Sequence, residues 1–188
     1  HNPSIVTGKE LALLRHRVSG SEEINRQILN FIDFVEQRAK EKGPLRNKDA
    51  VRVLLTGCPT GHGTEKVIDI IENLGAVVVA QENCSGLKGV LGDTTEDTDN
   101  PLKAIAKRHF DLPCSCMSPN KGRIELIKKL AKEFNATIIV DLVWQACHTY
   151  NVEHEMIKDP LAQAGLPIIK IETDYSQDIS QDSIQTLF

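Results

Sequence analysis

Cysteine is the residue type with the clearest chemical potential in this sequence of 188 residues. The five cysteines are Cys58, Cys84, Cys114, Cys116 and Cys147. Thiolates ligate zinc and iron–sulfur clusters, and buried thiols also serve as inert packing groups. An odd number of cysteines, in a chain of this size with no visible export signal, argues against a disulfide framework. Metal or redox chemistry is therefore the hypothesis to examine, with packing thiols as its alternative.

The spacing of the cysteines leaves the identity of a metal open. A structural zinc site usually takes two close pairs of cysteines, whereas a single Cys-x-Cys stands here beside three isolated residues. Five thiolates exceed one tetrahedral site, and iron–sulfur clusters accept scattered thiolate ligands. Small residues around two of the cysteines, in 56–63 (TGCPTGHG) and 82–89 (ENCSGLKG), allow backbone N–H groups to approach cluster sulfides. These features favour a cluster without excluding zinc.

Strands and helices alternate from residue 51 onward, and these elements must position the cysteines. Near-continuous apolar runs predict strands, and apolar residues at helical spacing predict the helices between them. The predicted strands are 51–57, 76–82, 136–144 and 167–174, and the predicted helices are 64–74, 101–110, 122–134, 151–164 and 179–188. This order predicts an α/β fold, Rossmann- or flavodoxin-like, with a parallel four-stranded sheet covered by helices on both faces.

The positions of the cysteines follow the predicted strand ends. Cys58, Cys84 and Cys147 come shortly after the first, second and third strands, and the Cys-x-Cys pair lies in an irregular loop at 111–120. Ligands of open parallel sheets bind outside the carboxyl ends of the strands. We therefore expect the topology to gather all five thiols at one edge of the sheet.

Residues 1–44 precede the alternating pattern and predict a helical extension. Thr7 with Glu10 and Ser19 with Glu22 fit capping boxes, and isoleucines then recur at helical spacing. Gly43 and the proline after it end this region. We divide the chain into a helical extension, 1–44, and a parallel α/β domain, 45–188.

Composition argues against several classes of partner. The net charge is −4, which offers no electrostatic attraction for nucleic acid or an anionic membrane surface. No apolar run approaches the ~20 residues of a membrane span, and no targeting segment is visible. We therefore expect a cytoplasmic protein that binds neither nucleic acid nor membranes.

Four segments taken together resemble the D-component family, which comprises the 2-hydroxyacyl-CoA dehydratases, the benzoyl-CoA reductases and the double-cubane cluster reductases. The segments are TGCPTGHGTEKVIDIIENLGAVVVAQENCSG (56–86), DLPCSCMSPN (111–120), WQACHTYNVE (144–153) and PIIKIETDYS (167–176). The double-cubane branch is most similar, because Cys58, Cys114 and Cys116 accompany the two cysteines, Cys84 and Cys147, that the ordinary dehydratase type typically carries. The resemblance implies that all five are cofactor-binding metal ligands of a double-cubane or single 4Fe–4S cluster. It also implies that 45–188 is the cluster-binding C-terminal half of a longer two-domain protein.

The activity that the resemblance implies is an ATP-activated, low-potential reduction of small unsaturated substrates. Single electrons would come from an ATP-hydrolysing iron–sulfur activator protein, which uses the ATP, and the enzyme would be a homodimer or pair with a homologous subunit. Two alternatives stay open: a 2-hydroxyacyl-CoA dehydratase component with one 4Fe–4S cluster, and a non-catalytic zinc or thiol binding module. We expect the isolated domain to be inactive and mostly unable to hold a cluster.

Other polar residues near the cysteines have weaker claims to a role in catalysis. His62 and His148 are candidate proton donors, with loop histidines bonded to the backbone as the alternative. Glu82 and Glu172 end strands at the same edge, where we expect solvated carboxylates. Trp144 is expected to pack rather than react.

Overall fold

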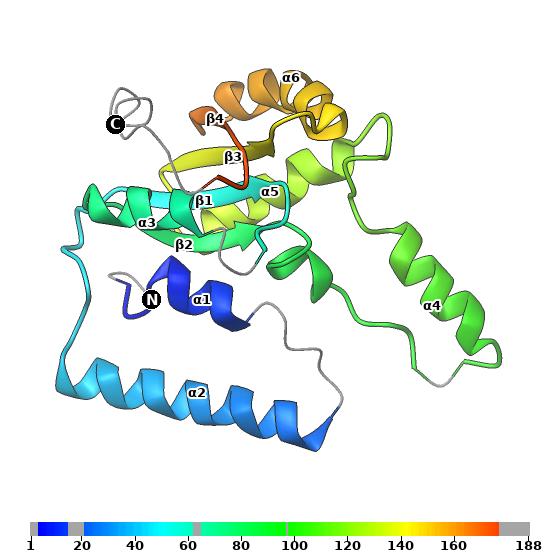
Figure 1. Ribbon diagram of the computed structural model, residues 1–188. Helices are drawn as coiled ribbons and strands as arrows, with labels where there is room; N and C mark the ends of the chain where they lie inside the picture. Colours follow the sequence, from blue (N-terminus) through cyan, green and yellow to red (C-terminus); the bar gives the residue numbers. More distant parts are fainter. Residues whose placement is uncertain (1–3, 15–20, 62–64, 97, 177–188) are drawn as a thin grey trace.

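The computed structural model describes residues 4–14, 21–61, 65–96 and 98–176. Within these ranges one sheet of four parallel strands has the order β2-β1-β3-β4 (Figure 1). The strands are β1 (Arg52–Gly57), β2 (Val77–Glu82), β3 (Ile138–Trp144) and β4 (Ile168–Thr173). Every residue of β1 and β2 is buried, as expected for parallel strands that are covered on both faces. The predicted α/β fold is confirmed, and each strand lies within two residues of its predicted limits.

Helices cover both faces of the sheet. The helices are α1 (Gly8–Leu14), α2 (Glu22–Glu41), α3 (Lys66–Asn73), α4 (Pro101–Phe110), α5 (Lys121–Glu133) and α6 (His148–Gln163), with a short 3₁₀ turn η1 (Leu87–Gly89). Alternate residues of β1 point to opposite faces. Val53 and Leu55 pack with side chains of α1 and α3, and Leu54 packs with side chains of α5 and α6. Figure 1 shows α6 above the sheet and α1 below it.

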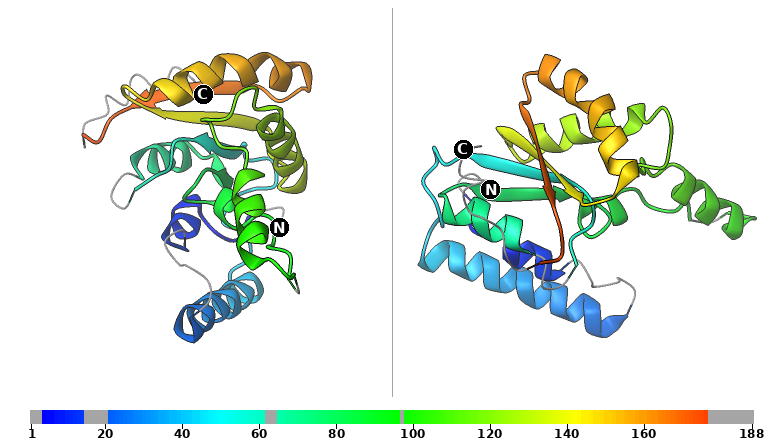
Figure 2. Two further views of the ribbon diagram at one scale, coloured as in Figure 1. Left: turned by 90° about the vertical axis from the view of Figure 1, so that its right-hand side faces the viewer. Right: turned by 45° about the horizontal axis from the view of Figure 1, so that its top comes forward.

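Two helices extend away from the sheet. Every residue of α4 is at least partly exposed, and Figures 1 and 2 show this helix projecting from the body of the molecule. Helix α2 lies beyond α1, and its Arg38 forms an ion pair with Glu10 of α1. None of the helices in the described ranges is both long and apolar enough to cross a membrane.

Some local predictions differ from the structure. Helix α6 begins at His148 rather than 151, which adds a first turn that contains Tyr150. The turn η1 was not expected, because three residues carry too little periodicity to predict a helix. The helix predicted at 179–188 lies outside the described residues.

The strand order creates a crevice between β1 and β3. The chain leaves β1 to form β2 on one side, and it later forms β3 on the other side of β1. Loops that leave the carboxyl ends of β1 and β3 therefore diverge, and such a switch point is where open α/β sheets bind ligands. Cys58 and Cys147 lie on these two loops.

Candidate functional site

Cys58 and Cys147 form a pair at the crevice between β1 and β3. Cys58 is only 2% exposed and packs in a cluster with Val143, Trp144 and Tyr150, against which Cys147 also lies. Its backbone N–H donates to the carbonyl oxygen of Leu142 at 2.7 Å, and the N–H of Trp144 donates to its Sγ at 3.4 Å. Burial raises the pKa of the Cys58 thiol to about 12, although the bond from Trp144 acts in the opposite direction.

Gly57 makes the placement of Cys58 possible. Its φ is +102°, in a region that residues with a Cβ rarely adopt. A Cβ at this position would lie 2.1 Å from the carbonyl oxygen of Leu142. A glycine is therefore required where β1 turns toward β3.

Cys114 and Cys116 form a second pair in the loop before α5. The backbone N–H of Cys116 lowers the pKa of the Cys114 thiol, and the ammonium group of Lys88 acts in the same direction. The hydrogen bond with Cys114 raises the pKa of the Cys116 thiol. Asn120 holds the loop, because its Nδ2 donates both to the carbonyl oxygen of Cys114, at 2.8 Å, and to Glu153.

Cys84 is a single, exposed thiol after β2. Side chains on either side of it tie its turn to the loop that follows β1: Asn83 Nδ2 donates to the carbonyl oxygen of Cys58, and Ser85 Oγ donates to that of Thr60. These bonds keep Cys84 at the same edge of the sheet as Cys58.

Tyr150 packs beside the Cys58 and Cys147 pair. It is 6% exposed and belongs to the Cys58 cluster. Burial raises the pKa of Tyr150, a nearby Cys84 raises it further, and a hydrogen bond with Ser115 lowers it. The ring also lies against Lys88 and Arg123, so it separates the Cys58 pair from these two buried cations.

The candidate donors suit thiophilic metals. Cys58 and Cys147 pack beside Tyr150, and thiol ligands favour zinc or iron–sulfur centres over hard cations such as Mg²⁺. Among the described residues, no three cysteine, histidine, aspartate or glutamate side chains already converge as a ligand set. A centre held by three or more of these thiols therefore requires their loops to close toward one another.

A buried ionic network lies beneath the thiols, and the sequence interpretation missed it. Its members come from strands β1, β2 and β3, from η1, from α5 and the residue before it, and from α6: Thr56, Glu82, Lys88, Asn120, Arg123, Asp141, Glu153 and His154. Arg123 is completely buried at the centre. Its guanidinium donates to Glu82 Oε2 at 3.3 Å and to Glu153, and it lies 3.6 Å from Asp141.

The charges of this network are largely compensated. Burial disfavours the charged guanidinium, but the carboxylates of Glu82, Glu153 and Asp141 raise the pKa of Arg123 above its ordinary value. Lys88 Nζ lies 2.9 Å from Glu82 Oε1. The guanidinium carbon of Arg123 lies 4.9 Å from the centre of the Tyr150 ring, which fits a cation–π contact.

The expectation of a solvated carboxylate is wrong for Glu82, which is fully buried, whereas Glu172 is exposed as expected. The turn η1 supplies Lys88 and α5 supplies Arg123, so the Glu82 carboxylate is paired instead of hydrated. One signal for this network was present in the sequence. Arg123 shares the apolar face of its helix with Ile127, a position where an unpaired charge would be costly.

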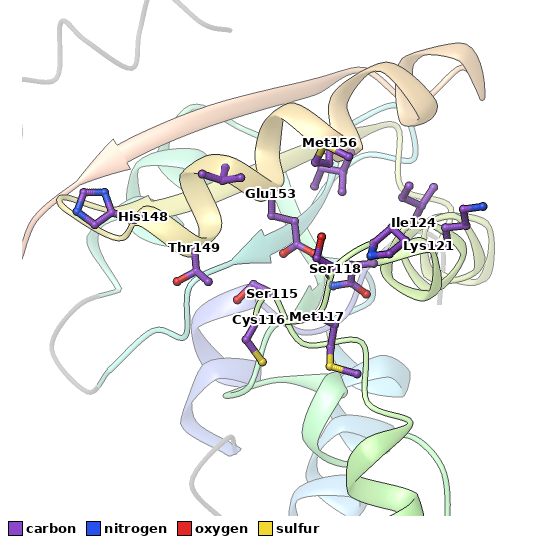
Figure 3. Close-up of a pocket in the computed structure, with 14 residues that line it drawn as sticks. Ser115, Cys116, Met117, Ser118, Lys121, Ile124, His148, Thr149, Glu153 and Met156 are labelled. Atoms are coloured by element: carbon purple, nitrogen blue, oxygen red, sulfur yellow. Dashed lines mark hydrogen bonds between the residues drawn. The ribbon is translucent and has the colours of Figure 1, made fainter.

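His148 lies at the start of α6 and lines an open cavity of about 560 Å³ (Figure 3). Cys116 lines the same cavity. The second candidate proton donor, His62, lies outside the described residues. Trp144 packs as predicted, with its Nε1 donating to the carbonyl oxygen of Pro59.

Comparison of the sequence with known proteins identifies a matching protein family. The sequence model of the family described as 2-hydroxyglutaryl-CoA dehydratase, D-component, matches residues 1–186. The putative dehydratase subunit YjiM of Escherichia coli (strain K12) is 38% identical over 159 residues, which are 82% of this chain and 41% of YjiM. The (R)-phenyllactyl-CoA dehydratase beta subunit of Clostridium sporogenes is 26% identical over 140 residues, 74% of this chain and 36% of that subunit. The chain thus spans less than half the length of these relatives.

Proposed function

Since the chain belongs to the 2-hydroxyglutaryl-CoA dehydratase D-component family, we propose that it forms the thiolate-bearing part of a 2-hydroxyacyl-CoA dehydratase-like enzyme. The observation that supports this most is the packing of Cys58 and Cys147 together beside Tyr150, at the edge where the strands end. In this proposal all five cysteines are ligands of an iron–sulfur cofactor.

The finer proposal is a double-cubane cluster in an ATP-activated reductase of small unsaturated substrates, and the alternative is a dehydratase component that holds one 4Fe–4S cluster. Five thiols exceed the four that one cubane takes, and two of the three groups of thiols are pairs. The cluster would supply single-electron chemistry at low potential. Electrons would come from an ATP-hydrolysing iron–sulfur activator, and a homologous subunit would complete the enzyme. The beta-subunit name of the clostridial relative supports a multi-subunit assembly.

The protein's own residues provide burial around such a cofactor and a candidate proton donor. Trp144 and Tyr150 are nearly inaccessible to solvent and exclude water from the Cys58 side. Lys88 and Arg123 lie beneath Tyr150 and are paired with buried carboxylates, so they support the ring beside Cys58 from below. His148 is our candidate for a proton donor, since it is exposed beside the cavity that Cys116 lines.

Iron and acid-labile sulfide analysis tests this proposal. The protein would be produced anaerobically with iron–sulfur assembly machinery, in the full-length form that contains this chain. We expect about eight irons per chain for a double cubane, against about four for a single cluster. Zinc without sulfide would contradict both enzyme interpretations and leave a binding module.

Single substitutions separate the two cluster types. With a double cubane, Cys58→Ser or Cys114→Ser lowers the iron content, as Cys84→Ser does. With a single cluster, only Cys84→Ser and Cys147→Ser lower it. Met117→Leu, in the same loop as Cys114, is the matched control and should leave the iron content unchanged.

A further inference from the structure

The projecting helix α4 presents an apolar stripe to solvent. Leu102, Ile105, Ala106 and Phe110 recur at the i, i+3, i+4 and i+8 positions, which lie on one side of a helix. Leu102 is 77% exposed, Phe110 is 75% exposed and Ile105 is 45% exposed. Side chains at this spacing are the anchors by which an amphipathic helix binds in an apolar groove of a partner.

Another side of α4 is tied to the domain. The guanidinium of Arg108 donates to the carbonyl oxygen of Gly89 at 2.6 Å and to that of Gly92 at 3.1 Å. These bonds fix the base of the helix beside the turn η1. The apolar stripe is therefore displayed on an anchored helix, and Figures 1 and 2 show that this helix lies apart from α1 and α2.

The same molecule contains an apolar groove of about 320 Å³. Helices α1 and α2 line it with Leu11 and Ile28, the edge strand β2 with Val79, and the region of η1 with Leu87 and Val90. Val90 is 67% exposed although it is a large apolar side chain. Apolar surface that lines a groove commonly marks an interaction site.

The helix and the walls of the groove have opposite net charges. Helix α4 carries Lys103, Lys107 and Arg108 and contains no carboxylate. Helix α2 has two more carboxylates than cations, with Glu22, Glu23, Asp33, Glu36 and Glu41 against Arg26, Arg38 and Lys40. Such complementarity favours the docking of α4 beside α2 over the pairing of two α4 helices, whose cations would repel one another.

The helix and the groove adjoin one another. Gly89 and Gly92, which hold Arg108 of α4, stand on either side of Val90, which lines the groove. A twofold axis near this junction allows the α4 of each copy to reach the groove of the other. Contacts of this self-complementary kind are the commonest in homodimers, and they bury each surface twice.

We propose that the groove formed by α1, α2, β2 and η1 receives the α4 helix of a second copy of this chain, and that the exchange is reciprocal. Leu102, Ile105 and Phe110 enter the groove, and Lys103 and Lys107 face the acidic side chains of α2. The inference rests on the proposed function for the presence of a second subunit, and it names the surface that joins the two.

Sedimentation velocity of the full-length protein that contains this chain tests the proposal. We expect a dimer, and we expect Ile105→Arg on the helix and Val90→Arg in the groove each to raise its dissociation constant at least about tenfold. Val152→Arg is the matched control, because Val152 is also a valine that is 67% exposed and lies outside both α4 and the groove. It should leave the dissociation constant unchanged, and circular dichroism checks that every variant is folded.

A mixture of the two interface variants tests the reciprocal exchange. In a mixed dimer, the unaltered α4 of the Val90→Arg copy meets the unaltered groove of the Ile105→Arg copy. One of the two contacts is then restored, so the mixed dimer should form at least about tenfold more tightly than a dimer of either variant alone.

Three results would overturn the proposal: a monomeric full-length protein, a dimer that neither variant weakens, and variants that do not complement one another when mixed. Weakening by Ile105→Arg alone would also overturn it, because α4 would then dock on a different surface. Sedimentation does not depend on iron, so these failures are distinguishable from a failure of the proposed function, which iron and sulfide analysis detects.

Discussion

The two cysteine pairs are held in place by different kinds of interaction. Cys58 and Cys147 are fixed by main chain: Cys58 follows β1 directly and bonds to the backbone of β3, and Cys147 N–H donates to the carbonyl oxygen of Trp144 at 2.9 Å. Cys114 and Cys116 lie in an irregular loop whose main-chain hydrogen bonds, among the described residues, stay within the loop region, and side chains connect it through Asn120 and Glu153 to the buried Arg123.

This difference separates a rigid side of the site from an adjustable one. Strand ends in a packed sheet move little without disturbing the core. A loop held by a few side-chain bonds can shift when one of those bonds is exchanged. We therefore expect the Cys58 pair to fix the location of a bound cofactor, and the Cys114 pair to close onto it.

Removing the centre of the network should have the largest effect on stability. Arg123→Met leaves the carboxylates of Glu82, Asp141 and Glu153 buried near one another without their shared cation. We expect the free energy of unfolding to fall by about 3–5 kcal/mol, measured by urea denaturation. Lys132→Met, an exposed basic position on the same helix, should change it by less than about 0.5 kcal/mol. If Arg123→Met lowers the unfolding free energy only slightly, the loop that holds Cys114 and Cys116 must be anchored by other interactions.

The second-largest expected effect is a difference in thiol alkylation rate between the two cysteine pairs. In the metal-free protein, a Cys58 pKa of about 12 leaves only about one thiol in ten thousand ionised at pH 8, whereas the pKa of Cys114 is lowered. Since the thiolate is the reactive form, Cys58 should be alkylated by iodoacetamide about a thousandfold more slowly than Cys114. The rate at Cys58 should rise about tenfold per pH unit up to its pKa, because a raised pKa delays ionisation. Mass spectrometry of the labelled peptides measures both rates, and similar rates would contradict the rigid, buried placement of Cys58.

A substitution at Gly57, where the backbone conformation requires glycine, should disturb the Cys58 side of the site and not the Cys114 side. Gly57→Ala combines a positive φ with a Cβ that overlaps the Leu142 carbonyl oxygen, so we expect a loss of about 2–3 kcal/mol in unfolding free energy. Gly75→Ala is the matched control: its φ is +92°, but nothing lies within 4 Å of the added Cβ, and about 1 kcal/mol is expected. Equal losses at the two positions would show that contact between the turn and β3 is unimportant.

The rigid side of the site could be predicted from the sequence, and the adjustable side could not. The strands are short apolar runs, so their ends, and with them the places of Cys58, Cys84 and Cys147, follow from local pattern. The network depends instead on side chains that meet only in the folded protein, such as Arg123 with Thr56, 67 positions away. Charged residues within apolar helix faces, Arg123 on α5 and Glu153 on α6, were the available signal.

The start of α6 shows how a small local error can hide a functional feature. The predicted helix began at 151, which left Tyr150 in a loop beside Cys147. The observed first turn begins at His148 and places Tyr150 on the buried face of α6, together with Ile157 and Leu161. This position brings the tyrosine ring onto Arg123 and beside Cys58 and Cys147.

The smallest effect that we expect concerns the anchor of the Cys-x-Cys loop. Asn120→Ala removes the donor to the Cys114 carbonyl oxygen and to Glu153, so the unfolding free energy should fall by about 1 kcal/mol, while Cys114 becomes several-fold more reactive and Cys58 does not. Asn100→Ala is the matched control, since Asn100 also precedes a helix and accepts a hydrogen bond from the N–H of Lys103. Asn100→Ala should lower the free energy of unfolding by a similar amount, because a helix cap is lost, but it should not change the reactivity of Cys114. If instead both variants left Cys114 labelling unchanged, the loop would be held by its own backbone, and the contrast between the two pairs would lose its physical basis.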